Sequence, residues 1–255
     1  MSKRGSLVDS AIADQWQSAT NYMALMHADR RSFAWEWLRR HPPYRSAWLG
    51  RRPRPDAFGL LAYEDPDRPT PEARPIWTRE RDRRVIDSRP AMMTNRSNDL
   101  FDIRALADLV SVEVDERGTE HWLLSDGQWA VRLALHNGTL LGGPVLLEHR
   151  LIGIDSAQLK IQALRQLVAL VRKGHMPTML RPREARAPRW ILELRTADGL
   201  AAGASQQELG RAFFGSAIPD RRWRVESPSY RLRVQRLVRT ARRYLADPLS
   251  GPWFD

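Results

Sequence analysis

Fourteen side chains in the C-terminal part of the chain have the types and spacing that suit contact with a nucleic acid. Six arginines lie between Pro228 and Ala246, and no acidic residue lies among them. Guanidinium groups bind phosphates and guanine edges through paired hydrogen bonds. The candidate DNA-binding residues are Ser205, Gln206, Gln207, Arg211, Arg221, Arg222, Arg224, Ser229, Tyr230, Arg231, Arg233, Arg236, Arg239 and Arg243. The competing interpretation is a solvated basic face on an ordinary helix.

The arginines belong to a predicted helix over residues 228–246. Ser227 suits the N-cap and Pro228 suits the first helical position. At 100° per residue the apolar side chains form one stripe that can pack on a core, and most arginines fall on the opposite face. The apolar positions are Tyr230, Val234, Leu237, Val238, Ala241, Tyr244 and Leu245, and the opposite face holds Arg236, Arg239, Arg242 and Arg243.

A second predicted helix precedes the arginine helix and suggests a helix-turn-helix. The run Ser205-Gln-Gln-Glu208 is a capping box that opens a short helix to Phe214. The connection over residues 215–226 has about twelve residues, whereas a standard turn has three or four. It carries Arg221, Arg222 and Arg224, which we expect to contact phosphates. A helical hairpin with a basic loop is the alternative.

Composition points to a polyanionic partner. The chain has 255 residues, a formal net charge of +11 and a pI of about 10.9, which favours nucleic acid or an anionic membrane surface. It has no cysteine, which excludes disulfides, thiolate zinc sites and cysteine nucleophiles. No apolar run is long enough to span a bilayer, and residues 1–13 lack the apolar region of a signal peptide. We therefore expect a cytoplasmic protein.

The sequence shows no motif typical of an enzyme. None of the six histidines stands in a ligand spacing such as HxxxH, although His121 and His149 could meet across a sheet. Asp99, Asp102 and Asp108 fit helix-capping positions better than metal ligation. We predict no cofactor, no metal site and no catalysis, and an enzyme acting on DNA is the weakest of the alternatives.

The order of the predicted elements indicates an α+β fold in three parts. Residues 14–50 form a small helical unit rich in aromatic side chains, in which Trp35 and Trp37 cannot both face a core because they are two residues apart. Residues 51–98 hold seven prolines and read as an extended linker. Residues 99–255 begin with an antiparallel β-meander over residues 110–154 and continue as the helical helix-turn-helix region.

At these residues the chain resembles a known pair of bacterial domains. Residues 189–215 and 227–245 look like the end of the C-terminal domain, and residues 123–135 and 140–151 look like its strands. Residues 33–48 and 65–77 look like an N-terminal transcriptional regulator-like domain. The arrangement is similar to the FseA-like transcriptional activators, which promote excision of integrative and conjugative elements.

The resemblance implies a DNA-binding activator of excision and transfer genes on a bacterial mobile genetic element. Its implied partners are promoter double-stranded DNA, RNA polymerase and a small antiactivator related to the C-terminal domain. Paired half-sites would suit a homodimer. The alternative is a protein-interaction module, an antiactivator or adaptor, whose basic helix binds a protein partner.

Overall fold

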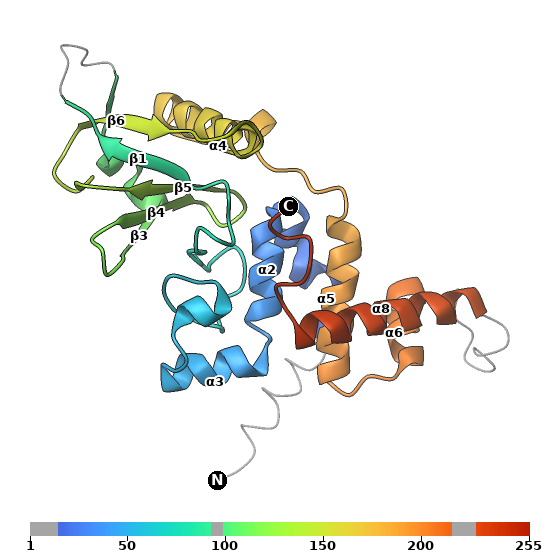
Figure 1. Cartoon of the computed structure of the whole chain (residues 1–255). Helices are drawn as coiled ribbons and strands as arrows, with labels where there is room; N and C mark the ends of the chain where they lie inside the picture. The colour runs from blue at the N-terminus through green and yellow to red at the C-terminus, as the bar shows by residue number, and fades with distance from the viewer. Residues whose placement is uncertain (1–14, 93–98, 216–227) are drawn as a thin grey trace, which may run out of the picture. The chain divides into compact units, whose positions relative to one another are not determined.

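The computed structural model describes residues 15–92, 99–215 and 228–255, which divide into two compact units (Figure 1). Unit 1 combines the chain up to Pro42 with Glu184–Trp253. Unit 2 consists of Pro43–Arg183 with Phe254–Asp255. The chain thus leaves unit 1 to form unit 2 and then returns, so residues far apart in the sequence share one core.

Unit 1 is helical and is organised around α5. Its elements are the 3₁₀ helices η1 (Gln15–Gln17) and η2 (Ala19–His27) and the α-helices α2 (Arg30–Leu38), α5 (Ala187–Ala201), α6 (Gln206–Phe214) and α8 (Pro228–Ala246). Helix α5 contacts α6 and α8 as well as η1, η2 and α2. Three of the helices expected in a separate unit over residues 14–50, namely η1, η2 and α2, therefore pack on the C-terminal helices, because their aromatic side chains need a partner surface for burial. Helix α3 belongs to unit 2 instead.

Unit 2 contains a six-stranded sheet covered on one face by α4. Its elements are α3 (Pro42–Gly50), η3 (Pro55–Phe58), β1 (Ile86–Pro90), β2 (Leu100–Phe101), η5 (Ile103–Leu109), β3 (Val110–Val114), β4 (Glu120–Ser125), β5 (Ala130–Leu135), β6 (Val145–Arg150), α4 (Ile154–Lys173) and η6 (Thr178–Leu180). Ala163, Leu167 and Leu170 of α4 pack into the apolar core formed with the sheet.

The sheet is mixed rather than a simple meander, and the α+β class is confirmed. Its strand order is β2-β6-β1-β5-β4-β3. Strands β3, β4 and β5 form the expected antiparallel meander. Strand β1 then lies between β5 and β6, parallel to the former and antiparallel to the latter. Residues 139–141 lie inside the predicted meander but are not part of a strand, and Leu140 is buried in a bend.

Strand β1 lies inside residues 51–98, which the sequence pattern predicted to be an extended linker. The sequence pattern did not indicate this strand because Asp87 and Ser88 are polar. Both residues are nevertheless buried, and their hydrogen-bonding partners come from other elements of unit 2. Asp87 accepts from Lys160 at 2.6 Å, and the Ser88 hydroxyl lies 2.8 Å from His149 Nδ1. Internal pairing of this kind lets polar residues occupy the middle of a sheet.

The dipeptide Asp126-Gly127 predicts a two-residue hairpin loop, and the turn between β4 and β5 forms there with a longer loop. Ser125 pairs with Ala130, so four residues connect the strands instead of two. Gly127 has a φ of 94°, and a Cβ there would lie 1.9 Å from the Pro71 carbonyl oxygen. Only glycine fits this close approach.

Candidate nucleic-acid interface

Helix α8 packs on the core of unit 1 through one stripe of buried side chains. Val234, Val238, Ala241 and Tyr244 are buried at spacings of four and three residues, which places them on one side of an α-helix. The stripe predicted from the sequence is therefore the packed face of α8. Pro228 begins the helix as predicted, while the proposed N-cap Ser227 lies outside the described residues.

The core under α8 joins three helices at close range. Trp16, Leu209, Val234 and Val238 form one buried apolar cluster. A Cβ at Gly199 would lie 2.6 Å from Leu209 Cδ2 and 3.1 Å from the Trp16 ring. Glycine at this position therefore allows α6 and η1 to pack closely against α5. Helix α8 packs on the core that these helices form.

Helix α6 begins at a complete capping box. The Ser205 hydroxyl accepts from the Glu208 amide at 3.3 Å, and the Glu208 carboxylate accepts from the Ser205 amide at 2.7 Å. Both amides are thus paired at the N-terminus of α6. Gln206 and Arg211 are exposed, so α6 presents polar side chains beside α8.

All six arginines of α8 are exposed. Two of them rest on aromatic rings. The Arg233 guanidinium lies 4.6 Å from the Phe214 ring centre and 5.7 Å from that of Tyr230. Arg243 lies 4.7 Å from the Tyr244 ring centre. These contacts hold both guanidinium groups close to the helix surface.

The other four arginines of α8 carry uncompensated charge. Within the described parts of the chain, no carboxylate forms a salt bridge with Arg231, Arg236, Arg239 or Arg242. Four cations on one helix, with no anion on that helix, create a positive surface that attracts phosphates.

A hollow of about 410 Å³ lies between α5 and α8 beside this surface. Its lining includes the apolar residues Leu192, Phe214 and Leu237 together with Arg233 and Arg236. The full lining is Pro188, Arg189, Leu192, Glu193, Phe214, Arg233, Arg236, Leu237 and Thr240.

Glu193 is the acidic member of that lining, and it is almost fully buried. Its Oε1 accepts from Arg189 Nε at 3.1 Å. Burial raises the pKa of Glu193 above its ordinary value, although Arg189 and Arg243 act in the opposite direction. The Glu193 carboxylate thus faces Arg189 of its own helix rather than the arginines of α8.

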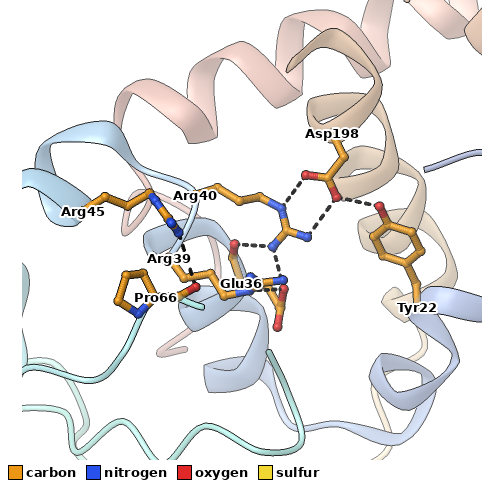
Figure 2. A network of polar contacts seen from close by, with 7 residues as sticks. All are labelled: Tyr22, Glu36, Arg39, Arg40, Arg45, Pro66 and Asp198. Carbon is orange, nitrogen blue, oxygen red and sulfur yellow. Dashed lines mark hydrogen bonds and ion pairs between the residues drawn. The ribbon is translucent and has the colours of Figure 1, made fainter. Parts of the chain in front are cut away.

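A network of charged side chains fastens the N-terminal helices to α5 (Figure 2). Arg40 donates from Nε to Asp198 Oδ1 at 2.6 Å and from Nη1 to Glu36 Oε2 at 2.5 Å. The Tyr22 hydroxyl donates to Asp198 Oδ2 at 2.5 Å, and Arg39 donates to Glu36 at 2.7 Å. The network thus joins η2 and α2 to the helix that supports α6 and α8.

Opposing effects set the pKa values in this network. Partial burial alone would raise the pKa of Asp198, but the positive charge and hydrogen bonds of Arg40 outweigh it and hold the pKa below its ordinary value. Burial and the neighbouring Asp198 carboxylate raise the pKa of Tyr22. Asp198 is therefore an ion-paired carboxylate at neutral pH.

Both Trp35 and Trp37 are fully buried, which corrects the prediction that the two could not share a core. Helix α2 is covered on more than one side. Trp37 packs against Tyr244 of α8 at 5.2 Å between ring centres, and Phe33 on the same helix contacts Trp190 at 5.0 Å. A helix surrounded by neighbours has no solvent face to reserve for polar residues.

The predicted site residues that can be described gather on two neighbouring helices. Ser205, Gln206, Gln207 and Arg211 belong to the start and body of α6, and Ser229, Tyr230, Arg231, Arg233, Arg236, Arg239 and Arg243 belong to α8. Arg221, Arg222 and Arg224 lie outside the described residues. The contacts of any of these side chains with DNA remain predictions.

Arg189, Thr240 and the Asp198 network were missed from the sequence. Arg189 and Thr240 line the hollow between α5 and α8, and they come together only when the chain folds. Asp198 and its partners are 158 and 176 residues apart in the chain, so no local spacing reveals them.

The histidines do not form the cross-sheet pair considered from the sequence. His121 of β4 pairs with Glu113 and Ala134, whereas His149 of β6 pairs with Ser88. Strands β5 and β1 separate the two. In the described parts of the chain, no three His, Asp or Glu side chains are placed to hold a metal ion. Likewise, no described helix has the length and apolar character needed to cross a membrane.

Two family models match parts of the chain. Residues 15–58 match the proteobacterial transcriptional regulator-like domain. Residues 151–247, which include α5, α6 and α8, match a domain described as "T6SS, Transcription factor, DNA binding domain". No curated protein shows significant similarity. Neither matched family is an enzyme family. Together with the exposed arginines, these matches support a DNA-binding transcriptional regulator.

Proposed function

We propose that this protein is a transcriptional activator of a bacterial mobile genetic element, and that it binds promoter DNA and promotes expression of excision and transfer genes. The observation that carries the DNA-binding part is the set of four exposed arginines on α8, which have no salt-bridge partner among the described residues, while the opposite side of the helix packs on a buried apolar core. This helix lies inside the match to a DNA-binding domain. The activator role and the mobile element rest on the resemblance of residues 14–80 and 99–255 to FseA-like activators.

In the proposed complex α8 enters the major groove with its N-terminal end nearest the bases. Ser229, Tyr230 and Arg231 lie there, where recognition helices usually contact base edges. Arg236, Arg239 and Arg243 follow along the helix and suit phosphates. Helix α6, through Gln206, Gln207 and Arg211, and the loop arginines Arg221, Arg222 and Arg224 would add backbone contacts.

The proposal implies a cytoplasmic protein with several partners. Promoter double-stranded DNA is the first, RNA polymerase and a small antiactivator are the next, and a second copy of the chain would match paired half-sites. The alternative function is an antiactivator or adaptor that uses the same basic helix to bind a protein. A salt titration of binding to the DNA upstream of its own gene separates the two. Binding no stronger than to competitor DNA would favour the adaptor.

Arg239→Ala is expected to weaken binding to all DNA sequences about equally. If Arg239 contacts a phosphate, its loss makes the slope of log K against log salt shallower by about 0.9. Fluorescence anisotropy with one specific and one random duplex at several salt concentrations measures this slope. Arg117→Ala is the matched control, because Arg117 is an exposed arginine of unit 2. An equal change in both variants would contradict a phosphate contact at Arg239.

Arg231→Ala is expected to act on specificity instead. If Arg231 contacts a base edge, specific binding weakens by about 1–3 kcal/mol while random DNA is affected much less. The same anisotropy assay gives both affinities. A uniform loss on the two duplexes would instead assign Arg231 to the DNA backbone.

A further inference from the structure

A hollow of about 700 Å³ opens in unit 2 where strands β1 and β6 lie side by side. This volume falls in the range of small-molecule binding sites, which is about 300–1,000 Å³. The proposed function uses α6 and α8 of unit 1 and gives this hollow no role. Its lining is largely polar and includes Arg79, Asp87, Ser88, His136, Glu148 and Arg150. We call it the β1 hollow.

Two polar residues of a central strand are buried at this hollow. The exposed fraction is 5% for Asp87 and 3% for Ser88. A buried polar group lowers stability unless other groups are placed to satisfy it, so apolar side chains are the rule in the middle of a sheet. Positions that break such a rule are frequent at functional sites. The polar stretch of β1 therefore marks the hollow as a candidate binding site.

Three nitrogen-bearing side chains surround the Asp87 carboxylate. Lys160 Nζ lies 2.6 Å from Oδ2, Arg79 Nη1 lies 2.8 Å from Oδ1, and His136 Nε2 lies 3.4 Å from Oδ1. Burial alone would raise the pKa of Asp87, but Lys160 and Arg79 outweigh it and hold the pKa below its ordinary value. Asp87 is thus ionised at neutral pH, and it balances only one of the positive charges around it.

Arg150 supplies a further positive charge. It lies directly opposite Asp87 in the antiparallel pair of β1 and β6, where side chains are close enough to interact. Asp87 nevertheless takes its partners from Lys160 and Arg79. Arg150 is exposed, and it forms no salt bridge with any residue that the structure describes. Its guanidinium donors are therefore available to a ligand.

The hollow as a whole carries more positive than negative charge. Four cations and two carboxylates lie at it, which leaves a surplus of two positive charges when His136 is counted as neutral. The cations are Arg79, Arg89, Arg150 and Lys160, and the carboxylates are those of Asp87 and Glu148. A hollow lined by one sign of charge concentrates ligands of the opposite sign.

We propose that the β1 hollow binds a small organic molecule with a doubly charged anionic group, either a phosphate ester or a dicarboxylate. Two negative charges match the surplus at the hollow. Arg150 holds the anionic group, because a guanidinium forms paired hydrogen bonds with phosphate and carboxylate oxygens. Ser88 and Asn137 provide neutral hydrogen-bonding groups in the same lining for the rest of the molecule. The site belongs to unit 2 and does not rest on the proposed DNA binding.

Titration of the ¹⁵N-labelled full chain with methyl phosphate and, separately, with succinate tests the site. Above about pH 7 methyl phosphate is mostly a dianion, because the second pKa of a phosphate monoester is near 6. We expect at least one probe to shift the amide signals of Ser88, Arg89 and Arg150 saturably, with a dissociation constant of about 10 mM or below. These amides report on the hollow and not on the arginines of α8, which also attract anions.

The probe that binds identifies the class of the anionic group. If neither probe shifts these amides saturably, the proposal is overturned.

Arg150→Ala is expected to weaken binding of that probe at least about tenfold, because it removes charge-assisted hydrogen bonds to the anion. Arg117→Ala is the matched control, since Arg117 is an exposed arginine of unit 2 that is not among the residues lining the hollow. Both substitutions lower the net charge by one. Equal losses in the two variants would show diffuse attraction to a basic protein and would overturn the assignment of Arg150.

Glu148→Gln tests the charge balance in the opposite direction. Glu148 pairs with Arg89 at 2.9 Å, and both side chains are more than half exposed, so the variant should keep its fold. Removing this carboxylate raises the surplus of positive charge, and we expect probe binding to tighten about threefold or more. Glu113→Gln is the control, because Glu113 is exposed on β3 at the edge of the sheet. Unchanged or weaker binding in Glu148→Gln would contradict the proposed role of charge.

The DNA backbone is the competing occupant of the hollow. We expect Arg150→Ala to change the affinity for duplex DNA by less than about twofold, as expected for a screened charge outside the DNA contact. A loss of duplex affinity as large as the loss of probe affinity would assign the hollow to the DNA-binding surface and overturn the small-molecule site. The probe titrations contain no DNA, so their failure and the failure of the proposed function are distinguishable.

Discussion

Replacing Asp198 by asparagine is expected to lower the free energy of unfolding by about 2–4 kcal/mol. The variant keeps the shape of the side chain, so no cavity forms. It removes the anion that Arg40 contacts through two nitrogens, at 2.6 and 2.9 Å. The exposed fractions of the two side chains are 14% for Arg40 and 27% for Asp198, so water compensates poorly. The remaining exposure and the Glu36 contact keep the cost below that of breaking a fully buried pair.

Chemical denaturation followed by tryptophan fluorescence measures this loss. Asp67→Asn is the control, because Asp67 forms a 2.6 Å pair with Arg45 in which both side chains are exposed. Such a pair contributes about 0–1 kcal/mol. Equal destabilisation by the two substitutions would contradict the role of Asp198 as the link between the N-terminal helices and α5.

The stability difference between the unaltered protein and Asp198→Asn should depend on pH. The folded pKa of Asp198 lies below its ordinary value, so its contribution is fully present above the unfolded pKa of about 3.9. As the pH falls through the folded pKa, Asp198 takes up a proton and the contribution is lost. The gap should therefore shrink below about pH 4. A stability difference that stays constant down to pH 2 would show that the charge of Asp198 is not its cause.

The triple variant Arg231→Ala, Arg236→Ala and Arg239→Ala is expected to lower DNA affinity by about three orders of magnitude at physiological salt. These guanidinium groups are exposed and have no salt-bridge partner among the described residues. Each would contribute about a tenfold factor through phosphate or base contacts. Alanine is the best helix former, so α8 should persist.

The control is the triple variant Arg83→Ala, Arg117→Ala and Arg183→Ala, which removes three exposed arginines from unit 2. Both variants reduce the net charge by the same amount, so a difference between them reports position rather than total charge. A loss of less than tenfold in the α8 variant would exclude α8 as the main DNA contact. It would instead favour the adaptor function.

The parts of the fold set by neighbouring residues could be predicted from the sequence. The capping box at Ser205 and Glu208 gives the start of α6. Gly174 has the left-handed φ of 71° that ends α4. Pro228 at the first helical position gives the start of α8, and the periodic apolar residues continue almost to its end at Ala246. Each of these signals depends on residues within one or two helical turns of one another, so the local sequence is enough to predict the structure there.

The parts set by distant residues could not be predicted. Strand β1 is polar, and it is stable inside the sheet because Lys160 and His149 reach Asp87 and Ser88 from other elements. Trp35 and Trp37 are both buried on α2, and Trp37 packs against Tyr244 of the distant helix α8. The sequence suggested that α6 pairs with α8 as a helix-turn-helix but did not indicate that both pack on α5. The connection of α5 to Arg40 and Tyr22 depends on folding across most of the chain.

The split of unit 1 between the two ends of the chain has a consequence for biosynthesis. Trp16, Phe33 and Trp37 leave the ribosome well before α5 and α8, the helices that help to bury them. About 140 residues of unit 2 are translated in between, which takes roughly 7–30 s at about 5–20 residues per second. Unit 2 can thus fold on the ribosome while the aromatic N-terminal segment still lacks its core. During that interval we expect the nascent segment to need shielding by chaperones, and the arginine surface becomes complete only after α8 has been synthesised.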